Sequence, residues 1–121
     1  MKTKTKELIG PALDWAVAKC EGYIDDHYIW LYEATMQEVA EGSYHPSTDW
    51  AQGGPIIERE LIRVIAPTIR GVDWIARIKH GLPSNMNGWF EKTGPTPLIA
   101  AMRCYVASKL GDSVEVPDSI K

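Results

Sequence analysis

One segment of the chain, residues 44–54, collects the residue types that bind small ligands. Tyr44 and Trp50 carry flat aromatic rings with a polar edge, which suits stacking on a ligand at a wet surface. Ser47 and Thr48 can begin a helix, and the unpaired N–H groups of a helix start favour an anion. These residues indicate a site for a small anionic molecule that contains a planar ring.

The second half of this segment breaks the rules for a stable helix. Asp49 suits a first helical turn but opposes an anion there, so we expect it to hold a base edge, a hydroxyl or a capping amide. Gly53 and Gly54 weaken a helix by about 1 kcal/mol each, and Pro55 removes a backbone donor. We therefore expect an interrupted helix whose glycines let a ligand approach the backbone, with Gln52 beside it. The alternative is that the glycines allow close helix packing and that the tryptophan of this segment lies in the core.

Two residues outside the segment could complete the site. Arg59 has a planar guanidinium that can meet an anion with two parallel hydrogen bonds, and Trp74 can supply a second stacking face. The predicted ligand-binding residues are therefore Tyr44, Ser47, Thr48, Asp49, Trp50, Gln52, Gly53, Gly54, Arg59 and Trp74.

The same residue types give no support for catalysis. His45, Ser47 and Asp49 are close in sequence, but a nucleophilic triad needs groups that converge from different elements beside an oxyanion hole. The acidic pair Asp25-Asp26 and the histidines, His80 among them, lack the spacing of a metal-ligand motif, and no phosphate-binding glycine loop is present. We expect no catalytic residue, no bound metal and no cofactor, so the protein should not be an enzyme.

The length and net charge of the chain restrict the number of domains and the kinds of partner. The chain has 121 residues and a net charge of −3, which fit one soluble globular domain over residues 1–121 and argue against strong nucleic-acid binding. The charge is uneven, because residues 1–60 carry 5 basic and 11 acidic side chains whereas residues 61–121 carry 8 basic and 5 acidic ones. No apolar run is long enough to span a membrane, and Cys20 and Cys104 are expected to be reduced core residues.

The spacing of apolar residues predicts the elements that must position the 44–54 segment. Thr96 and Pro97 mark the clearest helix start. The expected helices cover residues 11–21, 48–60 and 97–110. The expected strands cover residues 23–33, 61–65 and 72–78, with 89–90 as a short edge strand or a loop. Residues 34–41 are expected to form a short amphipathic helix or a long loop. Residues 112–121 are expected to be an exposed tail.

The order of these elements predicts the fold class. Because strands that are apolar on both faces need a layer on each side, we expect an α+β fold. It should be a single-domain α-β-α sandwich with a short antiparallel sheet between helices. The expected core residues are Leu13, Val17, Ile29, Leu31, Ile57, Ile75, Ile99, Met102 and Val106.

Three stretches of the sequence resemble the NinX family of lambdoid phages. They are residues 13–22 (LDWAVAKCEG), 46–60 (PSTDWAQGGPIIERE) and 96–111 (TPLIAAMRCYVASKLG), and they follow one another in the order of the family. A looser similarity to phage α-β-α sandwich domains includes the Leu-Asp helix, the Ser-Thr-Asp helix start and the Thr-Pro start of the last helix. The resemblance implies a phage accessory protein made in the cytoplasm of the host bacterium, and it implies no particular chemistry.

The residues and the resemblance together lead to a hypothesis for function. We expect a non-catalytic protein that binds and sequesters a small anionic, nucleotide-like host molecule or defence signal. The alternative is a protein-interaction module that binds and modulates a host or phage protein through aromatic side chains. Both hypotheses allow a homodimer or a higher oligomer. A concave site at the 44–54 segment would favour the first, and a flat aromatic patch the second.

Overall fold

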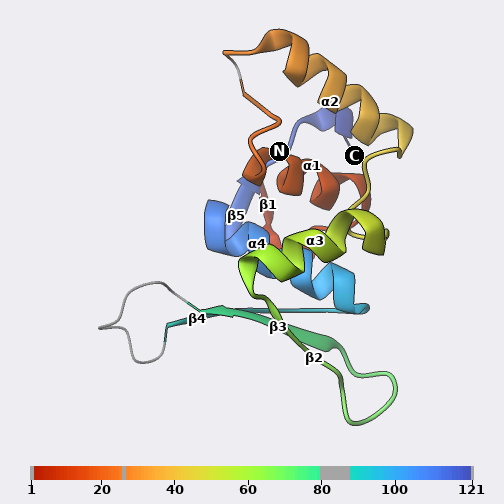
Figure 1. Ribbon diagram of the computed structural model, residues 1–121, viewed down its shortest axis with the longest axis vertical. Helices are drawn as coiled ribbons and strands as arrows, with labels where there is room; N and C mark the ends of the chain where they lie inside the picture. The colour runs from red at the N-terminus through yellow and green to blue at the C-terminus, as the bar shows by residue number, and fades with distance from the viewer. Residues whose placement is uncertain (1, 26, 80–87, 121) are drawn as a thin grey trace.

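The computed structural model describes residues 2–25, 27–79 and 88–120 (Figure 1). These residues form four α-helices, which are α1 (Gly10–Cys20), α2 (Ile29–Glu41), α3 (Trp50–Glu60) and α4 (Pro97–Leu110). They also form the strands β1 (Lys2–Lys4), β2 (Arg63–Ile65), β3 (Trp74–Lys79), β4 (Trp89–Gly94) and β5 (Ser113–Glu115). Two short 3-10 helices are η1 (Thr5–Glu7) and η2 (Asp118–Ile120). The predicted α+β class is confirmed.

The strands form two separate antiparallel sheets. In the larger sheet β3 lies between β2 and β4, and Figure 1 shows this sheet along one side of the molecule. In the smaller sheet β1 pairs with β5, so that Thr3 lies opposite Val114. The smaller sheet brings the first and last described segments side by side.

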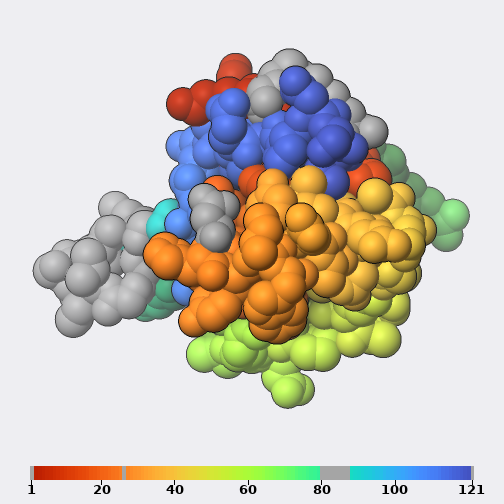
Figure 2. All heavy atoms as spheres, turned by 90° about the horizontal axis from the view of Figure 1, so that it is seen from above, coloured from red at the N-terminus to blue at the C-terminus, as the bar shows by residue number. Residues whose placement is uncertain are grey.

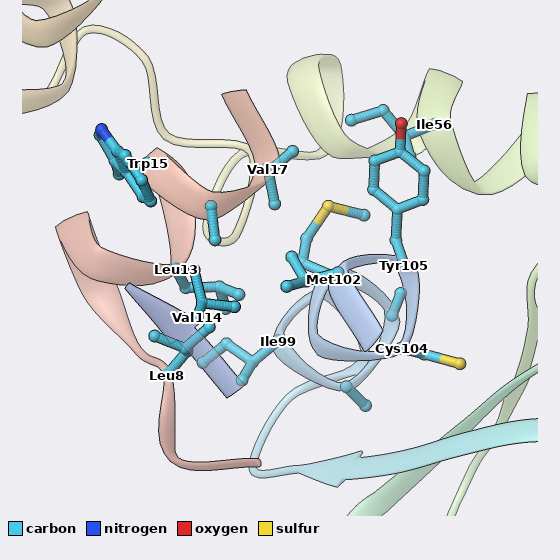
Figure 3. Packing of buried hydrophobic residues seen from close by; sticks show 14 of the residues in the cluster. Leu8, Leu13, Trp15, Val17, Ile56, Ile99, Met102, Cys104, Tyr105 and Val114 are labelled. Carbon is cyan, nitrogen blue, oxygen red and sulfur yellow. The ribbon is translucent and has the colours of Figure 1, made fainter. Parts of the chain in front are cut away.

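Helix α4 is the central element of the fold. Its buried residues surround the helix axis, and a helix that is apolar all round must be covered on every side. Figure 3 shows Met102 and Tyr105 pointing toward the helices that carry Val17 and Ile56, while Cys104 points away from them. The Sγ atom of Cys104 lies 3.2 Å from a carbonyl oxygen of β4. The buried residues of α4 are Leu98, Ile99, Ala100, Ala101, Met102, Cys104, Tyr105, Val106 and Ala107.

The order of the layers therefore differs from the predicted sandwich. Helix α4 packs on one face of the three-stranded sheet, α1 and α3 pack on α4, and no described helix covers the other face of the sheet (Figure 1). That outer face carries charged side chains, with Arg77 2.6 Å from Glu91 and Arg63 4.8 Å from the ring of Trp89. The element that is covered on both sides is the helix and not a strand, which the apolar strand pattern did not reveal.

The three predicted helices are confirmed with small changes at their ends. Helix α1 has Pro11 in its first turn, and α4 begins after Thr96, whose hydroxyl accepts the N–H of Ile99 at 3.1 Å. The interruption expected in the middle helix is wrong, because α3 continues through Pro55. Pro55 is exposed and lies in the second turn, so the helix loses a single hydrogen bond there.

The strand predicted over residues 23–33 is wrong, because residues 29–41 form α2. Thr35 and Val39 are buried one turn apart, whereas Ile29 and Trp30 are 61% and 68% exposed. A run of aromatic and β-branched residues imitates a strand here, but the helical spacing continues to Gly42. Gly42 ends the helix with a φ of +82°.

The exposed tail predicted over residues 112–121 is also wrong for its described part. Strand β5 pairs with β1, and Val114, Val116 and Ile120 are buried. Figure 2 shows this C-terminal segment lying beside α2. The partner strand has only three residues and lies at the opposite end of the chain, so no local pattern could indicate the pairing.

Most of the predicted core is confirmed. Leu13, Val17, Ile99, Met102 and Val106 are all buried within one hydrophobic cluster (Figure 3). The other predicted core residues are less buried, since Ile29 is exposed at the start of α2 and Leu31, Ile57 and Ile75 are only partly buried.

Both cysteines are free thiols, as predicted. Cys104 is fully buried and Cys20 is partly buried. Burial raises the pKa of Cys104 to about 11 and that of Cys20 to about 12. Both side chains are therefore held in the unreactive thiol form.

Candidate functional site

Hydrogen bonds within residues 45–49 build the turn before α3. The backbone N–H groups of Thr48 and Asp49 donate to the carbonyl oxygen of His45 at 3.1 and 3.0 Å. The Asp49 carboxylate accepts the N–H of Ala51 at 2.9 Å, so Asp49 is the helix cap. Its second oxygen lies 3.7 Å from Nε2 of His45. The capping role that the sequence allowed for Asp49 is the one observed.

A buried carboxylate in α1 holds this turn against the core. Asp14 is 5% exposed, and its Oδ1 atom accepts the backbone N–H of Ser47 at 2.9 Å. Burial raises the pKa of Asp14, and hydrogen bonding from Ser47 and the proximity of His45 offset only part of this rise. Asp14 therefore fixes the position of the turn relative to α1.

Gln52 ties the first turn of α3 to the preceding loop. Its Oε1 atom accepts the backbone N–H of His45 at 2.6 Å, and its Nε2 atom donates to the carbonyl oxygen of Ser43 at 2.8 Å. The side-chain amide is thus occupied by the protein backbone. Gln52 therefore holds the loop before α3 in place, and it does not line the pocket described below.

The two glycines of α3 have different surroundings. A Cβ atom on Gly53 would lie 2.4 Å from the carbonyl oxygen of Pro46 and 2.7 Å from Cδ2 of Leu98. A Cβ atom on Gly54 would make an ordinary contact, 3.9 Å from the ring of Trp50. The close neighbour that requires a glycine at position 53 is therefore protein, which agrees with the packing alternative.

A pocket of about 220 Å³ lies where α3 and α4 begin. Both helices present their N-terminal ends near it, which carry partial positive charge. The ring of Trp50 is 56% exposed at the pocket, in contrast to the core position of the alternative. The lining residues are Ser47, Thr48, Trp50, Thr96, Pro97, Leu98 and Ile99. This arrangement can hold a planar ring against tryptophan and an electronegative group near the helix ends.

Two buried polar atoms of the turn have no hydrogen-bond partner among the described residues. They are Oγ of Ser47, a residue 1% exposed, and Nδ1 of His45. A buried polar atom that stays unpaired costs free energy. The Asp14 carboxylate, whose pKa the Ser47 side chain lowers, is the protein group with which this hydroxyl can pair.

Seven of the ten predicted site residues lie outside the lining of the pocket, and three of these, Tyr44, Arg59 and Trp74, contact other parts of the protein. Tyr44 packs edge-on against Tyr23 with 6.0 Å between ring centres, and burial raises the pKa of its hydroxyl. Arg59 donates through two nitrogens to the carboxylate of Glu21, and Trp74 is half-buried in β3 against the core. Of the ten predicted residues, the pocket itself brings together Ser47, Thr48 and Trp50.

Sequence reasoning missed the second wall of the pocket, residues 96–99. Thr96 and Pro97 were identified as a helix start of the same kind as Ser47 and Thr48, and that similarity was the available signal. Only the packing of α3 on α4 shows that the two starts share one pocket.

The residues that the structure describes provide neither a metal-binding cluster nor a membrane-spanning helix. No three His, Cys, Asp or Glu side chains lie close enough to hold a metal ion in this part of the chain. None of the described helices is both long and apolar enough to cross a membrane. Asp26 and His80, which were considered as metal ligands, lie outside the described residues.

Comparison with known proteins and protein families identifies the family of the chain. A search among curated proteins returned no match. One family model, described as bacteriophage P22 NinX, matches residues 4–109. The matched range includes Asp14, the 45–49 turn and both walls of the pocket. The chain therefore belongs to the bacteriophage P22 NinX family.

Proposed function

We propose that this phage accessory protein binds and sequesters a small anionic, nucleotide-like molecule in the host cytoplasm, without turning it over. The supporting observation is the pocket of about 220 Å³ at the starts of α3 and α4. An exposed tryptophan ring, an apolar wall and two helix N-termini meet there. Membership of a phage family supports the accessory role.

The chemistry of the pocket restricts the ligand. Stacking of one base on an aromatic side chain contributes roughly 1–3 kcal/mol, which Trp50 can provide. A helix N-terminus stabilises a nearby negative charge by about 0.3–1 kcal/mol. The carboxylate of Asp49 sits at one of these termini, so a base edge or a sugar hydroxyl should lie near it and the charged group nearer Thr96. A pocket of this size encloses one ring system and leaves the rest of a larger ligand outside.

A thermal-shift screen against nucleotides, cyclic dinucleotides and ADP-ribose derivatives tests the proposal. A ligand at 100 times its dissociation constant should add about 2.7 kcal/mol of stability. Trp50→Ala should abolish the shift and leave the melting temperature of the free protein nearly unchanged, because the ring is 56% exposed. Trp30→Ala is the matched control, since that ring is 68% exposed and does not line the pocket.

The absence of turnover is tested on the same complex. A ligand identified in the screen should be recovered chemically unchanged after prolonged incubation with the protein. Metal analysis of the purified protein should find no stoichiometric zinc or manganese. Conversion of the ligand would contradict the proposed absence of turnover, and stoichiometric metal would contradict the proposed absence of a metal site.

A second candidate function is a protein-interaction module, which the start of α2 favours. Tyr28, Ile29 and Trp30 follow one another there and are 54%, 61% and 68% exposed. Aromatic side chains of this kind often anchor protein interfaces. If this function holds, Trp30→Ala should abolish capture of a phage or host protein, or dissociate a homo-oligomer, while Trp50→Ala leaves both intact.

A further inference from the structure

We infer that the protein has a second binding site, a cationic pocket that takes an oligophosphate group, where β1, β4 and β5 meet. The pocket has a volume of about 340 Å³ and is lined by Lys4, Lys6, Lys92, Asp112 and Ser113. It shares no lining residue with the pocket at the starts of α3 and α4. The inference goes beyond the proposed function and does not depend on it.

Buried Thr5 holds two of the lysines in place. Its side chain is 0% exposed, its N–H donates to the carbonyl oxygen of Asp112 at 2.8 Å, and its hydroxyl donates to that of Gly111 at 2.6 Å. Lys4 and Lys6 flank Thr5 in the chain and are exposed. Because Thr5 is locked against the segment after α4, both lysines are kept at the pocket and not on a free terminus.

The third lysine comes from a different element. Lys92 lies in β4 with its side chain 21% exposed, and its Nζ atom lies 3.4 Å from Oδ1 of Asp112. The Asp112 side chain is 90% exposed. Among the described residues, no carboxylate lies within ion-pair distance of Lys4 or Lys6. The pocket therefore concentrates three ammonium groups against one carboxylate.

This excess of positive charge defines the class of ligand. An ammonium group binds phosphate as a compact charge with several donors, and it does not need a planar partner. The three ammonium groups and the Asp112 carboxylate carry a net charge of about +2, which one phosphate dianion would balance. Two or three linked phosphates carry more charge and would engage all three lysines, with the exposed Asp112 side chain turned into solvent. Among the residues that the structure describes, no aromatic side chain lines the pocket, so the phosphates and not a base would carry recognition.

Calorimetric titration of the full chain with pyrophosphate tests the inference. We expect one saturable site that binds pyrophosphate more tightly than sulfate at equal ionic strength. Lys6→Gln and Lys92→Gln should each weaken binding roughly five-fold, as expected for loss of one partly exposed charge contact. Asp112→Asn should strengthen binding, because it removes the carboxylate and keeps the backbone carbonyl that holds Thr5. Lys2→Gln, which lies in β1 with Lys4 but outside the lining of the pocket, should leave binding unchanged.

The source of the phosphates is resolved by comparing pyrophosphate with ADP and AMP. Equal affinity for pyrophosphate and ADP identifies the oligophosphate alone as the ligand, and tighter ADP binding identifies a nucleotide whose phosphates enter this pocket. ADP binding that is lost in Trp50→Ala but retained in Lys92→Gln belongs to the other pocket. The inference is overturned if pyrophosphate gives no saturable binding, or if Lys6→Gln and Lys92→Gln leave that binding unchanged.

Discussion

At the scale of single residues, Gly53 and Gly54 are equivalent in the sequence but not in the structure. Gly53 faces the carbonyl oxygen of Pro46 and the side chain of Leu98, and Gly54 faces neither. The sequence showed that two glycines weaken the helix, and it could not show which of them is required. Only the position of a neighbour 7 residues back and another 45 residues ahead distinguishes them.

Alanine substitutions at these two positions should therefore have opposite effects. Gly53→Ala forces a Cβ atom against backbone and should destabilise the protein by about 1–3 kcal/mol. Gly54→Ala should be neutral or stabilise it by up to about 1 kcal/mol, because alanine is the better helix former. Urea unfolding of the two variants checks this, and equal effects would contradict the packing described for Gly53.

A second residue-scale prediction concerns the buried carboxyl group of Asp14. Because burial raises its pKa, the folded protein holds this proton more tightly than the unfolded chain does. Its contribution to stability should be most favourable at low pH and should decline as the pH rises from the ordinary aspartate value of about 4 through the folded pKa.

Two variants separate the charge of Asp14 from its hydrogen bond. Asp14→Asn keeps an acceptor for the N–H of Ser47 and should remove this decline, as unfolding free energies measured across the pH range will show. Asp14→Ala leaves that buried N–H unpaired and should cost about 1–3 kcal/mol at every pH. The prediction fails if the wild type and Asp14→Asn respond identically to pH.

At the scale of elements, helices and strands that are determined by neighbouring residues were predicted better than those determined by residues far away in the sequence. Helix α4 was predicted with its bounds because a capping threonine, a first-turn proline and a terminal glycine are local signals. The first part of α2 was wrongly assigned to a strand because aromatic residues satisfy strand and helix patterns equally over a short run, while residues 34–41 allowed a helix or a loop. The β1–β5 pair was missed because two three-residue strands leave almost no trace in the sequence.

The C-terminal segment should consequently matter for stability. Ile120 is 3% exposed, and Ile120→Ala should destabilise the protein by roughly 2–5 kcal/mol. Ser119→Ala, at the exposed neighbouring position, should change stability by less than about 0.5 kcal/mol. Thermal denaturation of both variants tests whether the segment is docked on the core. If the segment were frayed, neither substitution would change the melting temperature.

At the scale of the whole molecule, the central position of α4 determines which groups are protected. Cys104 lies between α4 and the sheet, and Cys20 lies near the end of α1. The layer order could not be predicted from the strands, because apolar residues of β3 lie on both faces of the sheet although the described helices cover only one of them (Figure 1). Only α4, whose residues 98–107 are apolar except for Arg103, indicates which element lies in the middle of the fold.

The two thiols should report on opening of this whole structure. The thiolate is the reactive form, and the pKa values of Cys104 and Cys20 are raised to about 11 and about 12. A thiol reagent at neutral pH should therefore label both groups slowly in the native protein and rapidly in denaturant. In Cys20→Ser, the labelling rate of Cys104 should follow global unfolding, and rapid labelling without denaturant would show that α4 separates from the sheet locally.

The pairing of β1 with β5 also has a consequence for synthesis on the ribosome. The strand Lys2–Lys4 is translated long before its partner, because the partner strand and the carbonyl oxygen that receives the Thr5 hydroxyl come 106 or more positions later. Residues 2–5 therefore stay unpaired until the segment 111–115 has left the ribosome. Closing so long a loop is slow, because its entropy is lost before any of its contacts form. Helix α4 ends at Leu110 and β5 begins at Ser113, so the core around α4 and the β1–β5 pair can both form only after this late part of the chain has left the ribosome.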